Sequence, residues 1–290
     1  MRELFPLTVS LITPLLDGVA RKIRARIQDR IGPPVLQTWY DLLSLLEMES
    51  IRPVESATFR IAPYLAFGSA LTMLFLIPWG EETPLRTPAN VIAFLYFFTL
   101  FSASVVMGGL SVRSSYTASG ASREISLSMV FKPAFAVVIA VLALKTGSLD
   151  IASIARSVDF SPSVVGAYIL LIYLTYVEAG FIPYDIAEAE TEILGGVLSE
   201  YSGRALAVFL WAFQVKRFAM LWLLSAMLVL PFASGIGALI LQSLAVLTIF
   251  VLMVVYESMN ARYRVDQALR KGAKALAAGS ILLVLAFAGW

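Results

Sequence analysis

Residues 163–192 decide the fold, and they read SVVGAYILLIYLTYVEAGFI followed by PYDIAEAETE. The first part is an almost wholly apolar run of about 20 residues, the length that crosses a bilayer as an α-helix. The second part places four carboxylates, Asp185, Glu188, Glu190 and Glu192, within eight residues directly after it. Because charge in or near a bilayer is costly, such a cluster is usually kept for ion handling or for a partner. This stretch therefore predicts a membrane helix that ends in a functional loop.

The same apolar pattern recurs along the whole chain. Hydrophobic residues make up 59% of the 290 residues and charged residues only 14%, with a mean hydropathy of +0.82. Soluble domains are nearer half apolar and a quarter charged. The sequence predicts an all-α, polytopic membrane bundle of about eight transmembrane helices, which forms a single integral membrane domain over residues 1–290. We expect spans at residues 4–20, 60–80, 89–112, 126–145, 163–182, 205–231, 235–256 and 271–290.

One further helix is expected after the first span. Residues 36–47, LQTWYDLLSLLE, have apolar side chains at helical spacing but are too short to cross a bilayer. We expect an amphipathic helix that lies along the membrane interface.

The distribution of Lys and Arg predicts the orientation. Alternate loops, residues 21–60, 113–123, 183–204 and 257–274, carry fifteen of these residues, whereas the loops and ends of the other side carry four. Because basic loops stay in the cytoplasm, the first set is expected there. The acidic loop is then cytoplasmic, in a multi-pass protein of the cell membrane. Its charge opposes the basic trend, which suggests a use other than topology.

The chain contains neither cysteine nor histidine. Without thiolate or imidazole ligands, we expect no zinc, haem or iron–sulfur cluster on this chain. Catalysis by cysteine or histidine is excluded as well. Any redox chemistry must therefore take place on another chain.

The acidic loop favours proton handling. Close carboxylates repel one another, so some of them should hold protons near neutral pH. Glu178, at the end of the fifth expected span, extends the cluster into the membrane. The alternative interpretations are a solvated acidic loop and a Glu178 side chain that reaches the interface.

Three basic residues fall within expected spans. Lys216 and Arg217 occupy the middle of the sixth span, where each costs roughly 2.5–3.5 kcal/mol on insertion scales. We expect them to face Glu178 or another acid across the bundle. The alternative is that this span breaks at the pair. Lys132 lies beside Pro133 in the fourth span, and it either joins this polar core or reaches a nearby helix end.

Residues 21–30, RKIRARIQDR, form the most basic run. The run could bind anionic lipid headgroups or dock a soluble protein. Nucleic acid is not expected, because the run is next to a membrane span and lacks interleaved aromatic residues.

Four ordered motifs resemble the subunit 1 (H) family of respiratory complex I. The segment RKIRARIQDRIGP at 21–33 is similar to the first-loop signature of that family, and PYDIAEAE at 183–190 resembles its motif PFDLPEAE. The segment EYSG at 200–203 follows at the distance seen in the family, and RYRVDQ at 262–267 resembles its last cytoplasmic loop. The resemblance covers nearly the whole chain.

Within this family, the chain resembles the branch of energy-converting (group 4) membrane-bound hydrogenases and ferredoxin-linked sulfane reductases. The compact segment GPPVLQ at 32–37, the segment GASRE at 120–124 and Lys216 are similar to that branch. Phe181 stands where the quinone branch usually has Arg. Lys132 departs from the hydrogenase pattern, which has an acid before Pro133, and this reverses a charge in the expected path.

The resemblance implies a membrane anchor that couples a soluble electron-transfer arm to proton or sodium translocation. The implied partners are soluble hydrogenase-like large and small subunits, an iron–sulfur subunit, antiporter-like membrane subunits and the lipid membrane. Iron–sulfur clusters, and a nickel–iron centre in some relatives, would be on those partners, so the chain would have no catalytic residue of its own. The implied ion path comprises Glu178, Asp185, Glu188, Glu190, Glu192, Glu200, Arg123, Glu124, Lys132, Lys216 and Arg217. The implied docking residues for the soluble arm are Arg21, Arg24, Arg26, Arg30 and Asp266.

Two other functions compete with this hypothesis. The first is the quinone-binding subunit of a complex I-like NADH dehydrogenase. The second is a stand-alone secondary transporter, but such transporters show inverted repeats and broken helices, and the sequence shows neither.

Overall fold

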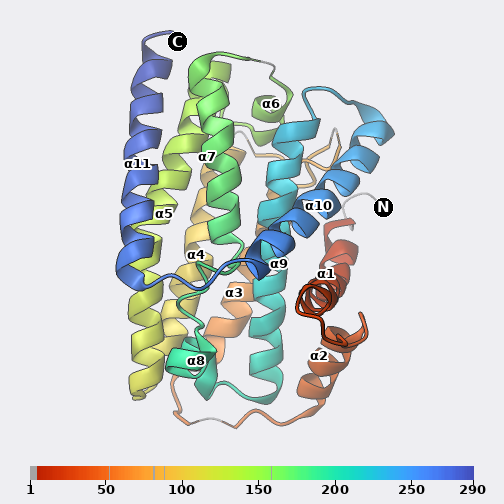
Figure 1. The fold of residues 1–290 in the computed structure, drawn as a ribbon, viewed down its shortest axis with the longest axis vertical. Coiled ribbons are helices and arrows are strands. Elements are labelled where there is room, and N and C mark those ends of the chain that lie inside the picture. Colours follow the sequence, from red (N-terminus) through yellow and green to blue (C-terminus); the bar gives the residue numbers. More distant parts are fainter. Residues whose placement is uncertain (1–4, 52, 81, 88, 158) are drawn as a thin grey trace.

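The computed structural model describes residues 5–51, 53–80, 82–87, 89–157 and 159–290. Arg2 and Arg52, which entered the count for the orientation, and residue 4, which entered the first expected span, lie outside these ranges. Within them the chain is helical throughout and forms no β-strand. The long helices stand side by side, with α11 against α5 at one edge and α1 with α2 at the other (Figure 1).

Each expected span corresponds to one long helix, and the expected amphipathic segment forms its own helix. The spans are α1 (Phe5–Ile27), α3 (Ala57–Leu76), α4 (Asn90–Leu110), α5 (Ser115–Thr146), α7 (Pro162–Glu178), α9 (Gly203–Val229), α10 (Gly235–Ser258) and α11 (Val265–Phe287). The amphipathic helix is α2 (Gln37–Glu47). Short helices complete the chain: α6 (Ile151–Arg156), α8 (Glu190–Ile193) and the 3₁₀-helix η2 (Gly196–Glu200).

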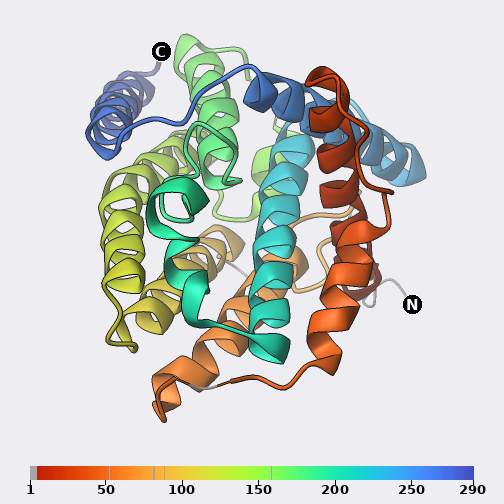
Figure 2. The same ribbon diagram turned by 60° about the horizontal axis from the view of Figure 1, so that its bottom comes forward.

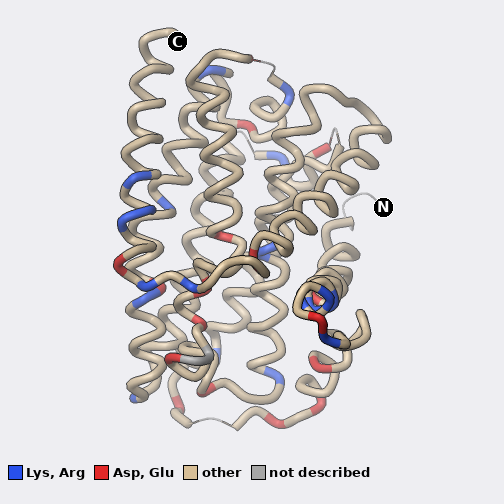
Figure 3. Tube along the Cα trace, in the orientation of Figure 1, with Lys and Arg blue, Asp and Glu red and all other residues tan. Residues whose placement is uncertain are grey.

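Five of these helices, α3, α4, α5, α9 and α10, are long and apolar enough to cross a membrane. Helix α7 is equally apolar but has 17 residues. Helices α1 and α11 instead carry basic residues over one end, and charged residues gather in the lower half of the molecule as drawn (Figure 3). The arrangement is that of a polytopic membrane bundle.

Several segments expected to be loops are helical, and the two at the ends of α1 and α5 carry many of the expected site residues. Helix α1 continues to Ile27, so most of the basic run is on a helix, and α5 begins at Ser115, so Arg123 and Glu124 are on a helix as well. Neither segment contains proline, and Lys, Arg and Ala are strong helix formers. With 32 residues, α5 is about 48 Å long and exceeds the roughly 30 Å of hydrocarbon in a bilayer.

Helix α9 occupies the centre of the bundle. It contacts α3 and α10 most extensively, and also α1, α2 and α7 (Figures 1 and 2). Its middle is therefore shielded on several sides, and Lys216, with a side chain 11% exposed, lies there. This placement makes α9 the helix on which a buried polar site can be built.

The acidic loop between α7 and α9 is held against α5 by a close backbone approach. A Cβ added at Gly120 on α5 would lie 2.8 Å from the Cα of Gly196 in η2. Gly196 itself has φ +58°, a left-handed conformation that glycine adopts at little cost. Small residues at this crossing place the loop directly over one end of α5.

Candidate functional site

Three charged side chains from three helices meet inside the bundle. The Oε2 atom of Glu178, at the end of α7, lies 3.3 Å from Nζ of Lys216 on α9 and 3.8 Å from Nζ of Lys132 on α5. All three side chains are 9–11% exposed. The contact expected between Lys216 and Glu178 is therefore present, and Lys132 joins it instead of reaching a helix end. The helix α9 continues unbroken through this site.

Aromatic rings and a carbonyl group compensate for the excess of positive charge. Lys132 Nζ lies 3.6 Å from the centroid of the Phe98 ring and donates a hydrogen bond of 3.3 Å to the Phe98 carbonyl. Lys216 Nζ lies 5.2 Å from the Phe101 ring. A desolvated cation over an aromatic face gains about 2 kcal/mol or more. Helix α4 thus stabilises the second ammonium group, which a single carboxylate cannot neutralise.

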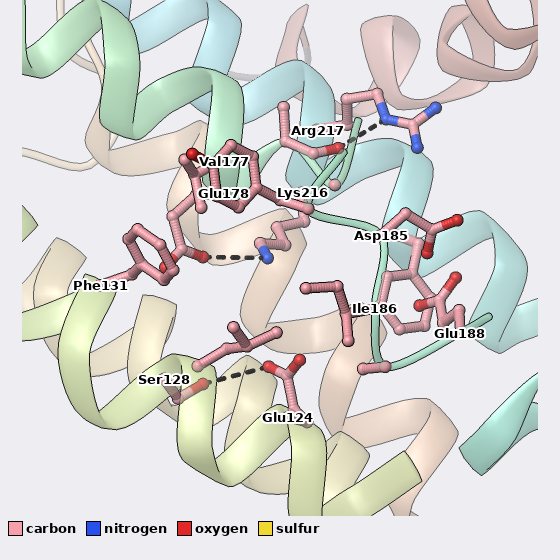
Figure 4. A pocket seen from close by; sticks show the side chains of 16 residues that line it. Glu124, Ser128, Phe131, Val177, Glu178, Asp185, Ile186, Glu188, Lys216 and Arg217 are labelled. Atoms are coloured by element: carbon pink, nitrogen blue, oxygen red, sulfur yellow. Dashed lines mark hydrogen bonds and ion pairs between the residues drawn. The ribbon is translucent and has the colours of Figure 1, made fainter. Parts of the chain in front are cut away.

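A polar cavity of about 90 Å³ adjoins this cluster, between α5, α7, α9 and the acidic loop (Figure 4). A site of this size holds several water molecules, since one needs about 10–15 Å³. Its charged lining residues are Glu124, Glu178, Asp185, Glu188, Lys216 and Arg217. Water in this cavity would connect the buried cluster to the loop carboxylates.

Among the described carboxyl groups of the acidic loop, Glu188 has a raised pKa. Burial, together with the charges of Asp185 and Glu124, raises the pKa of Glu188 to about 8, against the lowering effect of Arg217 and Lys216. Glu124 accepts a 3.1 Å hydrogen bond from Ser128, one turn further along α5. A carboxyl with a pKa of about 8 gains and loses its proton near neutral pH.

Two further acids of the loop, Glu192 and Asp185, form ion pairs. Arg123 Nη1 on α5 lies 2.6 Å from Oε2 of Glu192 and also donates to the carbonyl of Ile186. Arg262, just before α11, lies 2.9 Å from Asp185. These contacts connect the loop to α5 on one side and to the start of α11 on the other.

Two further expected members of the path lie apart from the cavity lining. Glu190 begins α8, and its side chain lies outside what the structure describes. Glu200 ends η2 and is half-buried. The structure therefore brings together only part of the predicted path at one cavity.

A second charged network surrounds Arg217, and its central acid is one that sequence reasoning missed. Asp17 on α1 lies 3.1 Å from Arg21, 3.9 Å from Arg24 and 3.6 Å from Arg217. Arg217 Nε also donates a 2.8 Å hydrogen bond to the carbonyl of Ala179, directly after Glu178. The spacing Asp17–Arg21, four residues apart on one helix, was the available signal.

Helices α2 and α10 extend this network. Asp41 on α2 lies 2.9 Å from Arg21, and a hydrogen bond from Gln37, with the Arg21 charge, holds the pKa of Asp41 below its usual range. Glu257, near the end of α10 and also unforeseen, lies 3.8 Å from Arg24. Arg21 and Arg24, expected to dock a soluble arm, thus have acidic partners within the chain.

The other expected docking residues are on the surface. Arg26 and Arg30 are exposed at the end of α1 and just beyond it. Asp266 is 53% exposed and lies 3.6 Å from Arg264. In the described part of the chain, no group of three or more Cys, His, Asp or Glu side chains could hold a metal ion.

The fold and this site define a class of protein: a multi-pass membrane protein with a buried cluster of charges under an acidic loop. Residues 3–288 match the family described as NADH dehydrogenase, and the chain belongs to that family.

Relatives in this family include components of different enzymes. Formate hydrogenlyase subunit 4 of Escherichia coli K12 is 33% identical over 285 residues, 92% of each chain. Hydrogenase-4 component C of the same organism is 33% identical over 268 residues, which cover 88% of this chain and 85% of the relative. A subunit of the NADH-quinone oxidoreductase of Wolbachia pipientis wMel is 28% identical over 323 residues, 96% of this chain and 94% of the relative.

The fold is shared with a solved structure. A chain in the membrane-bound sulfane sulfur reductase, an archaeal respiratory membrane complex, superposes with a TM-score of 0.84 at 19% identity and covers 98% of this chain and 97% of its own.

Proposed function

We propose that this chain is the membrane subunit of a ferredoxin-dependent, ion-pumping respiratory complex of the hydrogenase or sulfane reductase type. It anchors the soluble electron-transfer arm and couples redox energy to translocation of protons or sodium ions. The observation that carries this proposal is the buried Glu178 carboxylate shared by Lys132 and Lys216 beneath a cavity with room for water.

The local geometry supports a relay that begins at the loop. Glu188 has a pKa of about 8, and it lines the same cavity as Glu178, so water held there would connect the two carboxyl groups. A carboxylate between two ammonium groups changes the charge of the whole cluster when it takes up a proton. Lys132 and Lys216 would respond to that change through Glu178, because both share its oxygen. The relay thus gives a route from the loop to the middle of the bundle.

The second network supports a role for α1 in transmitting events from the soluble arm. Arg217 is next to Lys216 in sequence and binds Asp17, while Arg21 and Arg24 on α1 bind the same acid. A partner that shifts α1 would therefore shift charge next to the buried cluster. The exposed Arg26, Arg30 and Asp266 remain the docking residues of this proposal.

The proposed partners are soluble hydrogenase-like large and small subunits, an iron–sulfur subunit and antiporter-like membrane subunits. Two relatives at 33% identity are named as parts of formate hydrogenlyase and hydrogenase-4, which supports this kind of assembly. The metal centres, iron–sulfur clusters with or without nickel–iron, would be on those partners. The chain would lie in the cell membrane with the acidic loop in the cytoplasm, as the Lys and Arg bias predicts.

Quinone binding is the second candidate, and the relatives named as parts of NADH-quinone oxidoreductase favour it. A separate, small cavity between α1, α9 and α10, whose lining includes Asp17, Gln214 and Arg217 as well as apolar side chains, has about 10 Å³. That volume accommodates about one water molecule, not a quinone ring. Phe181, 1% exposed, packs against Arg217 with 4.9 Å between the guanidinium carbon and the ring centroid, which further closes this region.

Purification of the intact complex through a tag on this chain separates the two candidates. We expect reduced ferredoxin to be oxidised with protons or sulfane sulfur as acceptor, and ubiquinone or menaquinone to give no turnover. Metal analysis of the large soluble partner then distinguishes a nickel-containing hydrogenase from a sulfane reductase. Quinone turnover sensitive to a change in Arg217 would contradict the proposal and support the second candidate.

A further inference from the structure

A second and larger cavity, of about 480 Å³, lies between α7, α9 and α10. Its walls are apolar, with Ile172 on α7, Leu228 on α9, and Leu252 and Met253 on α10. Two of these helices, α7 and the inclined α10, lie at the front of the bundle in Figure 1. The walls suit a hydrocarbon chain, because they offer apolar surface with few polar groups.

One end of this cavity is polar. Tyr256, on the last turns of α10, and Tyr263, in the loop before α11, line it together with Lys271 on α11. Lys271 Nζ lies 3.6 Å from the centroid of the Tyr263 ring. No carboxylate of the described residues lies within 4.0 Å of this ammonium group. The cavity thus offers one exposed positive charge and several phenol groups, because its lining also includes Tyr173, Tyr176 and Tyr184.

The polar residues of this cavity lie near the connection between α10 and α11. Helix α10 ends at Ser258 and α11 begins at Val265, so this end is beside the turn between two long helices. Tyrosine is enriched at the membrane–water interface, and basic pockets between helices on the cytoplasmic side bind lipid headgroups. Arg270 and Lys274, both exposed on α11, lie outside the lining of this cavity.

We propose that this cavity binds one anionic phospholipid, with an acyl chain between α7 and α10 and the phosphate at Lys271. Lipid binding at this cavity does not require that the chain has the proposed coupling function. Its volume falls within the roughly 300–1,000 Å³ of small-molecule sites. A helix from a partner subunit fits less well, because 480 Å³ corresponds to about one turn of a helix about 10 Å across.

The lipid would also contact the acidic loop. Tyr184 in that loop lines both cavities, and its hydroxyl lies 2.6 Å from the hydroxyl of Tyr173 on α7. Its ring packs edge-on against Phe131 on α5, with 5.6 Å between centroids. An acyl chain against Tyr184 would therefore pack against a residue that also lines the polar cavity.

Native mass spectrometry of the purified complex tests the proposal, with dioleoyl phosphatidylglycerol and dioleoyl phosphatidylcholine as probes. We expect one phosphatidylglycerol per chain, bound about fivefold more tightly than phosphatidylcholine, the factor that one basic residue at a membrane surface contributes. Lys271→Gln should abolish this preference. Lys274→Gln, one turn along α11 and outside the cavity lining, should preserve it.

Leu228→Trp fills the cavity and should weaken the binding of both lipids. The two lysine variants remain informative if this variant fails to assemble, because they change exposed side chains. Equal preference for phosphatidylglycerol in the parent and in Lys271→Gln would overturn the proposal. A second result would also overturn it: the parent complex carries no bound lipid, and the Leu228→Trp complex lacks a membrane subunit. A partner helix would then occupy the cavity.

Discussion

Glu178 shares one carboxylate between two ammonium groups, and the stability of this part of the bundle depends on that sharing. Removal of one member of a buried ion pair costs about 3–5 kcal/mol, because the remaining charge loses its partner. Glu178→Leu leaves both Lys132 and Lys216 without their carboxylate, whereas Lys132→Leu leaves Lys216 at 3.3 Å from it.

We therefore expect Glu178→Leu to lower the free energy of unfolding by about 3–5 kcal/mol and Lys132→Leu to lower it by clearly less. Unfolding of the detergent-solubilised chain by increasing SDS, followed by circular dichroism, measures both. If both variants lost the same free energy of unfolding, removal of Lys132 would cost as much as removal of the carboxylate itself. That result would contradict the sharing of Glu178 between the two lysines.

Glu188 gives a pH dependence of known sign. Between pH 4.5 and about 8 the folded chain keeps a proton on Glu188 that the unfolded chain has lost, so stability falls as pH rises through this window. Glu188→Gln should remove that part of the dependence and raise the thermal midpoint at pH 8.5 relative to the parent. Melting curves at pH 6 and pH 8.5 measure it, with Glu47→Gln, an exposed acid on α2, as the control.

At this scale, the sequence predicted the contact required by the cost of burying a charge. It did not predict contacts between residues that are far apart in the sequence. An ammonium group in the middle of a span needs a partner, so the Lys216–Glu178 contact was predictable. Asp17 and Glu257 were missed because their partners, Arg217 and Arg24, are far away in the sequence. The spacing of Asp17 and Arg21 indicates a pair on one helix but not the contact with Arg217 on another helix.

At the scale of elements, the crossing of α5 and η2 fixes the position of the acidic loop. Gly120→Ala would put a Cβ 2.8 Å from the Cα of Gly196, and relief of that clash requires backbone movement. Overpacking of this kind costs about 1–3 kcal/mol. We expect lower stability, together with faster proteolysis within the loop.

Gly68→Ala on α3 is the matched control, because no atom lies within 4 Å of the added methyl group. Alanine there should leave stability unchanged or raise it by about 0.5–1 kcal/mol, as expected within a helix. Thermal unfolding and trypsin digestion of both variants provide the comparison. If Gly120→Ala behaved like Gly68→Ala, the loop would not be held by this contact.

The helices themselves followed from apolar runs, but their ends did not. The extra turns of α1 and α5 contain charged residues that a hydropathy pattern assigns to loops. In the structure these turns are stabilised from outside the helix: Arg24 contacts Glu257, and Arg123 contacts Glu192. The positions of these helix ends thus depend on tertiary contacts, which the hydropathy pattern of the sequence does not predict.

At the scale of the whole molecule, the order of helices makes a prediction about topology. Three long helices, α3, α4 and α5, separate Ser50 from Ser148. If each crosses the membrane once, cysteines introduced at the two positions should be labelled from opposite faces by an impermeant maleimide. The chain has no cysteine of its own, so background labelling is absent. Labelling of both from one face would contradict the predicted orientation.

The central claim is that Glu178 takes part in ion coupling, and the number of ions translocated per electron tests it most directly. Glu178→Gln keeps the size and hydrogen bonding of the side chain but removes its titration, and Glu47→Gln makes the same change at an exposed site. The complexes are compared in vesicles, with ferredoxin as donor and with an artificial acceptor as a check on the soluble arm. We predict that Glu178→Gln assembles and oxidises ferredoxin with the artificial acceptor while pumping falls at least tenfold, and that Glu47→Gln pumps like the parent. Parental pumping in Glu178→Gln would contradict the account.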